Sequence, residues 1–156
     1  MLIRLEQVTM SVSVCEMLVS VLHDADEDDE RIRARLLDVH YTAYAAYVGE
    51  QLVGAVVMRW DEDAGEIEYI AVDSACRGRG YGKAMVAQIL MLARRRGVHT
   101  VLVGTANSSL ENIAFYQKCD FCMDHVCRDY FAYVQPPVIQ NGIVMRDMLV
   151  LRYSWK

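Results

Sequence analysis

Three glycines alternate in a short stretch, residues 77–83, which we call the glycine turn. The turn lies between an apolar segment typical of a strand and a segment with helical periodicity, so we expect it to open a helix. A helix start leaves backbone N–H groups unpaired and carries partial positive charge. Glycine also lets the backbone approach a ligand closely. The turn therefore predicts a phosphate or pyrophosphate site built from Arg77, Gly78, Arg79, Gly80, Tyr81, Gly82 and Lys83.

Two common nucleotide-binding loops fit the glycine turn poorly. A P-loop has four residues between its first glycine and a Gly-Lys-Ser/Thr triplet, whereas Gly78 and Gly82 enclose three, and Lys83 is followed by Ala84. A dinucleotide fingerprint has the spacing G-x-G-x-x-G, whereas the glycines here alternate. A flexible connection between strand and helix is the remaining alternative to an anion site.

The motif Arg77-x-x-Gly80-x-Gly82 resembles the Q/R-x-x-G-x-G/A signature of the GNAT superfamily of acyl-CoA-dependent N-acetyltransferases. Residues 66–72 resemble the fourth strand of that family, and residues 115–121 resemble its F-Y-x-K-x-G-F segment. The resemblance implies that the anion is the pyrophosphate of acetyl-CoA, a cosubstrate, and that no metal takes part.

The resemblance also implies a role for the strand before the glycine turn. In the family this strand bulges and separates from the next one, and its freed backbone groups pair with the pantetheine arm. Here those groups belong to Ile70, Ala71 and Val72, and the N–H near Val72 would polarise the thioester carbonyl. Asn107 lies two residues before Ser109, where the family often has asparagine, and is a further candidate for contacts to this arm.

Three side chains are candidates for acid–base chemistry. The resemblance assigns Tyr116 as the general acid that protonates the departing sulfur, with packing as its alternative role. Glu66 and Glu68 are two residues apart on one predicted strand and share a face. Paired carboxylates raise one pKa toward neutrality, as a general base requires. Glu66 aligns best with the family's glutamate on this strand and is the preferred base, acting directly or through water. The alternative is that one or both glutamates simply face solvent and have no catalytic role.

Two other patterns carry weaker predictions. Cys119, Cys122, His125 and Cys127 are zinc-ligand types, but strand alternation places residue 122 opposite residues 125 and 127, so we expect no metal site. Residues 24–30 contain six carboxylates. We interpret them as a solvated loop that ends at a helix N-terminus; alternatively, they border the acceptor pocket and attract a cationic amine.

Strands and helices alternate around these residues. Predicted strands cover residues 2–8, 41–48, 52–60, 67–72, 100–103, 121–133 and 143–153, and predicted helices cover residues 15–23, 31–39, 83–96 and 108–118, the last opened by a capping box at Ser108 and Glu111. Hairpins give antiparallel pairs and helical crossovers give parallel ones. We expect one α/β domain over residues 1–156, with a mixed, mainly antiparallel sheet of six or seven strands and helices on both faces.

Composition narrows the class of protein. The 156 residues are 54% apolar and carry a net charge of −5, which suits an ordered domain and does not favour nucleic-acid binding. No segment approaches the roughly 20 apolar residues of a membrane span. Five cysteines without an apolar leader segment are typical of free thiols, so we expect a cytoplasmic protein.

The acceptor is the least specified part of the prediction. We expect acetyl transfer to a primary amine, with a small molecule favoured over a protein, and homodimer formation stays open. A non-catalytic module that binds acyl-CoA and regulates another process is the alternative function.

Overall fold

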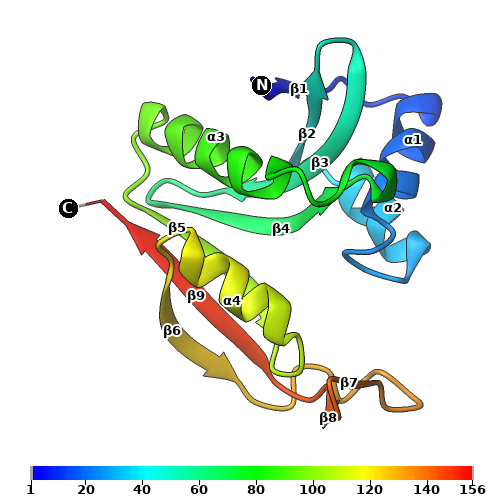
Figure 1. The fold of residues 1–156 in the computed structure, drawn as a ribbon, viewed down its shortest axis with the longest axis vertical. Helices are drawn as coiled ribbons and strands as arrows, with labels where there is room; N and C mark the ends of the chain where they lie inside the picture. Colours follow the sequence, from blue (N-terminus) through cyan, green and yellow to red (C-terminus); the bar gives the residue numbers. More distant parts are fainter. Residues whose placement is uncertain (1, 156) are drawn as a thin grey trace.

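A computed structural model describes residues 2–155 of the chain. Its main sheet has seven strands in the order β1-β2-β3-β4-β5-β9-β6 (Figure 1). The strands are β1 (Arg4–Gln7), β2 (Tyr41–Val48), β3 (Gln51–Trp60), β4 (Ala64–Val72), β5 (Thr100–Ala106), β6 (Cys122–Cys127) and β9 (Met148–Ser154). Strands β7 (Ile139–Gln140) and β8 (Ile143–Val144) form a separate hairpin. Among the described strands of this sheet, the β4–β5 pair is parallel and the other pairs are antiparallel, so the predicted mixed, mainly antiparallel sheet is confirmed.

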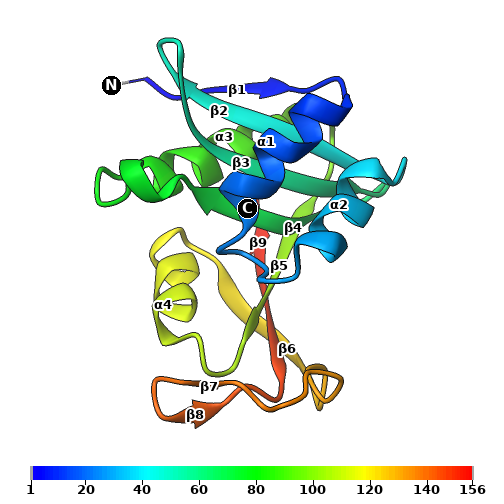
Figure 2. The same ribbon diagram turned by 90° about the vertical axis from the view of Figure 1, so that its right-hand side faces the viewer.

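Helices cover both faces of the sheet, as predicted (Figure 2). They are α1 (Val12–Leu22), α2 (Asp29–Leu37), α3 (Tyr81–Arg95) and α4 (Leu110–Lys118), with a short 3-10 turn, η1 (Ser74–Cys76), before α3. Helices α1 and α2 begin earlier than predicted because Ser11 and Asp28 cap them, each accepting hydrogen bonds from backbone N–H groups of the first turn.

The sheet separates two apolar cores. On one side Val56 and Met58 of β3 pack with residues of α3, and on the other Ala55 and Val57 pack with residues of α1 and α2. Alternate residues of a strand point to opposite faces, so β3 contributes to both cores. This packing fixes the position of β4 and of the N-terminal end of α3.

The C-terminal third departs most from prediction. The segment predicted as a strand over residues 121–133 leaves the sheet after Cys127 and continues in turns. Asp129 has φ 55, a left-handed conformation that ends a strand, and its N–H donates to the Asp147 carboxylate at 2.9 Å. The predicted strand over residues 143–153 is likewise divided into β8 and β9.

The predicted capping box is wrong. Ser109, rather than Ser108, is the N-cap of α4, and it makes no side-chain capping hydrogen bond. Ser108 Oγ instead lies 3.3 Å from Gln140 Oε1 in the β7 strand.

No helix within residues 2–155 is long and apolar enough to span a membrane.

Candidate active site

The glycine turn leads directly into α3, as predicted. Gly78 and Gly80 have φ of +76 and +79, in the region that favours glycine. Apart from the adjacent residues, no heavy atom of the described part of the chain lies within 4 Å of the position that a Cβ would take at either residue, and the N-cap Gly80 offers no side-chain cap. The turn thus leaves the N-terminus of α3 open on one side, which fits an anion that accepts hydrogen bonds from its N–H groups.

The basic side chains of the glycine turn are exposed. The Arg77 guanidinium pairs with Asp24, from the segment between α1 and α2, and its Nε donates to the Val72 carbonyl at 3.4 Å. Arg79 and Lys83 have no acidic partner within 4 Å in the described part of the chain. Both therefore add uncompensated positive charge beside the open helix end.

Strand β4 bulges and then separates from β5, as the resemblance implies. Val57 of β3 lies opposite Tyr69, and Met58 lies opposite Ile67, so Glu68 is the extra residue of a β-bulge. Pairing between β4 and β5 ends at Ile67 and Val103. Beyond it, the β4 segment that contains the predicted Ile70, Ala71 and Val72 pairs with β3 alone, so its other edge offers backbone groups to a ligand.

The three segments that resembled one family meet in space. A Cβ at Gly82 would lie 3.4 Å from the Phe115 ring and 3.7 Å from Val72 Cγ2. The start of α3, the end of β4 and the C-terminal part of α4 therefore meet at one point, next to the unpaired edge of β4.

Tyr116 follows Phe115 on α4 and is buried. Its ring packs against Phe115 at a centroid distance of 5.1 Å and against Phe121 at 5.7 Å. Burial, followed by the neighbouring Cys119 thiol, raises the pKa of the phenol well above its usual range. The phenol therefore carries its proton at neutral pH, as a general acid must.

The turn after α4 positions that aromatic cluster. Asp120 has φ 68 and so adopts a left-handed conformation, at the position where the F-Y-x-K-x-G-F segment has glycine. The Phe121 N–H donates to the Tyr116 carbonyl and the Asp120 N–H to the Gln117 carbonyl, each at 3.0 Å. These hydrogen bonds form a Schellman motif, and the Tyr116–Phe121 contact is its hydrophobic component.

Glu66 and Glu68 lie on the face of β4 that α2 covers, with Arg35 Nε of α2 donating to Glu68 Oε1 at 3.1 Å. Glu66 is half-buried. Burial first, and the Glu68 charge second, raise the pKa of the Glu66 carboxyl. Glu66 therefore has the character of a proton acceptor that works nearer to neutral pH than an ordinary glutamate.

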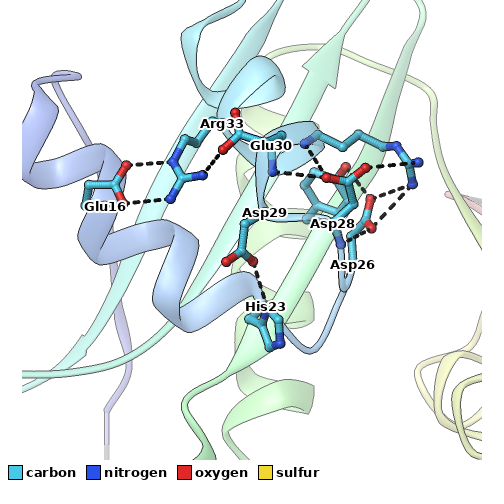
Figure 3. Close-up of polar contacts among 9 residues, drawn as sticks. Glu16, His23, Asp26, Asp28, Asp29, Glu30 and Arg33 are labelled. Carbon is cyan, nitrogen blue, oxygen red and sulfur yellow. Dashed lines mark hydrogen bonds and ion pairs between the residues drawn. The ribbon is translucent and has the colours of Figure 1, made fainter.

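The acidic segment at residues 24–30 is a largely exposed loop, as predicted, and ion pairs and hydrogen bonds hold it in place (Figure 3). Asp26 pairs with Arg31 at 3.1 Å and accepts a hydrogen bond from the Tyr69 hydroxyl at 3.0 Å. Asp28 caps α2, with Asp29 and Glu30 in the first turn, so the predicted position at a helix N-terminus is confirmed. The segment thus connects α2 with β4.

Asn107 is bound to the segment that leads into β9. Its Oδ1 accepts hydrogen bonds from the N–H groups of Arg146 and Asp147 at 2.9 and 3.0 Å. Its Nδ2 donates to the Val144 carbonyl at 3.1 Å. These contacts give Asn107 a positioning role for the loop between β8 and β9, and its contact with the pantetheine arm stays a prediction.

Sequence reasoning missed the residues that surround the two glutamates. Tyr130 and Tyr133 come from the turns after β6, and Arg31 of α2 lies 5.0 Å from the centre of the Tyr133 ring. Burial and the Glu68 charge raise the pKa of Tyr130. Arg31 and Arg35 are four residues apart, a spacing that could have indicated that both lie on one face of a helix. The neighbouring sequence, however, does not indicate which residues that face contacts.

The cysteine pattern does not form a metal site among residues 2–155. The predicted alternation was wrong because β6 has a bulge between Met123 and His125. The bulge brings Cys122, His125 and Cys127 to one face, opposite Arg152, Val150 and Met148 of β9. All five cysteines are free thiols.

An open, glycine-lined helix N-terminus beside a bulged strand that separates from its neighbour is the arrangement that the resemblance to acyl-CoA-dependent acyltransferases implies. The model of the acetyltransferase (GNAT) family matches residues 10–121. The chain belongs to this family and is an acetyl-CoA-dependent acetyltransferase.

Individual relatives agree with this assignment. The chain is 34% identical over 110 residues to the uncharacterized N-acetyltransferase YvbK of Bacillus subtilis, covering 69% of this chain and 71% of that protein. A Bacillus subtilis acetyltransferase crystallised with CoA has a TM-score of 0.87 at 28% identity and covers 99% of both chains. A GNAT family acetyltransferase from Elizabethkingia anophelis with acetyl-CoA bound has a TM-score of 0.84 at 25% identity and covers 98% of both chains.

Proposed function

We propose that this acetyltransferase transfers the acetyl group of acetyl-CoA to the primary amine of a small molecule, by direct attack of the amine on the thioester. One observation carries the proposal: the glycine turn, the unpaired edge of β4 and the part of α4 that contains Tyr116 lie next to one another. An anion site, a carbonyl-binding edge and a proton donor are thereby next to one another.

The glycine turn would hold the pyrophosphate through the N–H groups at the start of α3 and the charges of Arg79 and Lys83. The unpaired edge of β4, at Ile70, Ala71 and Val72, would hydrogen-bond the pantetheine arm. Such binding fixes the thioester next to the incoming amine, and positioning of this kind supplies much of the rate enhancement in a two-substrate reaction.

Acid–base chemistry would be divided between two sides of β4. Glu66, directly or through water, takes a proton from the ammonium form of the acceptor, and the neutral amine attacks the carbonyl carbon. The N–H of Val72 stabilises the oxyanion; one such donor contributes about 2.7–4 kcal/mol in a well-studied protease. After the C–N bond has formed, the C–S bond breaks and Tyr116 gives its proton to the sulfur. The nitrogen then releases its second proton to water, and the tyrosinate regains a proton from solvent.

The amine acceptor is favoured by the charges near Glu66. The Glu66 and Glu68 carboxylates lie on the same face of β4, with Tyr130 and Tyr133 nearby. Carboxylates attract an ammonium group, and aromatic rings provide contact area for the rest of a small molecule. The five free thiols suit a reducing cytoplasm as the working compartment.

The test is incubation of the purified protein with acetyl-CoA and a panel of primary amines, with matched alcohols as controls. We expect thiol release above the rate of thioester hydrolysis for at least one amine, and a mass increase of that amine by one acetyl group. Acetyl-CoA binding without acetylation of any amine would instead favour the non-catalytic module, and acetylated alcohols would identify an O-acyltransferase.

A further inference from the structure

Arg35 of α2 contacts β4 at the position where the strand bulges. Its Nε donates to Glu68 Oε1 at 3.1 Å, and the two side chains are 34% and 21% exposed. The guanidinium also lies 5.3 Å from the centre of the Tyr41 ring. An arginine held by a carboxylate and an aromatic ring has a restricted orientation, and its ion pair is less screened than one in open solvent.

The bulge explains why an arginine is placed here. Glu68 contacts Arg35, while the next residue, Tyr69, belongs to the core formed with α1 and α2. Two consecutive residues therefore face α2, which regular strand alternation would not allow. Arg35 binds the first of them, and one helical turn earlier Arg31 binds Asp26, which accepts a hydrogen bond from the Tyr69 hydroxyl.

We propose that Arg35 is a positioning residue of the catalytic carboxylates: it holds Glu68 as an ion pair and, through Glu68, controls the protonation of Glu66. The inference rests on the proposed function, in which Glu66 is the base. It adds a residue of α2 that sets the pH range in which the base works.

The charges around Glu66 explain how this control works. On β4 itself, the Glu68 charge raises the pKa of Glu66. From the β3 side, Arg59 lowers this pKa and Asp61 raises it. Tyr130, from the turns after β6, also lies near the two carboxylates. Glu66 has no cation within 4 Å among the described residues. With Arg35 removed, Glu68 would lose its partner, and its charge would oppose the ionisation of Glu66 more strongly.

The direct experiment follows the carboxyl carbons of Glu66 and Glu68 by NMR during a pH titration of the isotope-labelled protein. The variant is Arg35→Gln, and Arg33→Gln is the matched control, because Arg33 lies on the same helix but pairs with Glu16 and Glu30. We expect Arg35→Gln to raise the higher apparent pKa of the pair by about half a unit or more, Arg33→Gln to leave it unchanged, and Arg35→Lys to give an intermediate value.

A second variant keeps the inference testable if Arg35→Gln does not fold. In Glu68→Gln the amide oxygen still accepts from Arg35, while the carboxylate charge is gone, so the pKa of Glu66 should fall. Unchanged titration of Glu66 in either folded variant would overturn the inference.

The outcome is separable from the test of the proposed function. If Glu66→Gln abolishes the acidic limb of the pH–rate profile and Arg35→Gln leaves the titration unmoved, Glu66 is the base and Arg35 has no positioning role. If the titration moves as expected but the acidic limb survives in Glu66→Gln, the coupling between Arg35 and the pair is real and the base lies elsewhere.

Discussion

Strands β3 and β6 are built in opposite ways. Six consecutive residues of β3 are buried, and the strand lies between two apolar cores. Five of the six residues of β6 are exposed, and the strand forms an edge of the sheet that pairs with β9 alone. The first strand supports β4 and the N-terminal end of α3, whereas the second leads into the arm, residues 128–147, which reaches Glu66 and Glu68 through Tyr130, where we propose that the acceptor binds.

The difference suits the two substrates. Acetyl-CoA requires a fixed anion site and a fixed strand edge, and dense packing on both faces of a strand holds such a geometry. The arm is held mainly by polar contacts such as those of Asn107 and Asp147. Few buried apolar contacts imply a low free energy of local opening, so we expect the arm to adapt to different acceptors while the proposed acetyl-CoA side remains fixed.

The largest expected difference comes from truncating one methionine in each region. Met85 of α3 is fully buried between helix and sheet, whereas the Met123 side chain in β6 is 54% exposed. We expect Met85→Ala to lower the free energy of unfolding by about 2–5 kcal/mol, and Met123→Ala to change it by less than about 0.5 kcal/mol. Denaturant titration measures both; losses of similar size would contradict the contrast between the regions.

Removing the Asn107 amide tests the arm. Asn107→Ala deletes three hydrogen bonds to residues 144–147, which weakens their attachment by about 1–3 kcal/mol. We expect faster amide hydrogen exchange in this segment and a several-fold higher KM for the acceptor, with the Kd for CoA unchanged. A weaker Kd for CoA with an unchanged acceptor KM would instead support the predicted contact of Asn107 with the pantetheine arm.

Two aspartates with a left-handed backbone conformation, one in each region, provide a smaller test of the contrast in stability. Glycine at position 120 relieves the strain of φ 68 at the end of α4, so Asp120→Gly should raise the free energy of unfolding by about 1 kcal/mol. Asp129, with φ 55, lies in the arm. Because the arm is expected to open before global unfolding, Asp129→Gly should change global stability less. Equal gains would show that the arm unfolds together with the cores.

The smallest effect concerns the pH dependence of stability. The pKa of Glu66 is raised in the folded state, so its contribution to stability is present below the unfolded-state pKa and is lost as pH rises through the folded-state pKa. Glu66→Gln has no such loss. The Tm of Glu66→Gln relative to the wild type should therefore increase from acidic to neutral pH, which thermal unfolding at several pH values measures; a constant difference would argue against the raised pKa.

The proposed acetyl-CoA side could be predicted because the residues that indicate it are close together in the sequence. The glycine turn places its charges and unusual φ values within seven residues, and the resemblance added the bulge and separation of β4. The acceptor side depends on contacts between distant segments. Arg35 and Glu68 are 33 residues apart. The segment after Cys127 was predicted to continue the strand, but Asp129 turns it away through a hydrogen bond to Asp147. Nothing near these residues in the sequence specifies such partners.

The central claim is that Tyr116 lies where the thioester is held and donates a proton to its sulfur. The most direct test compares Tyr116→Phe with the wild type in two quantities, the Kd for acetyl-CoA and kcat with an amine that the panel identifies. We predict that kcat falls by about 10²-fold or more, because general acid catalysis is removed, while the Kd stays within about twofold because the glycine turn and the β4 edge are intact. An unchanged kcat would contradict the account.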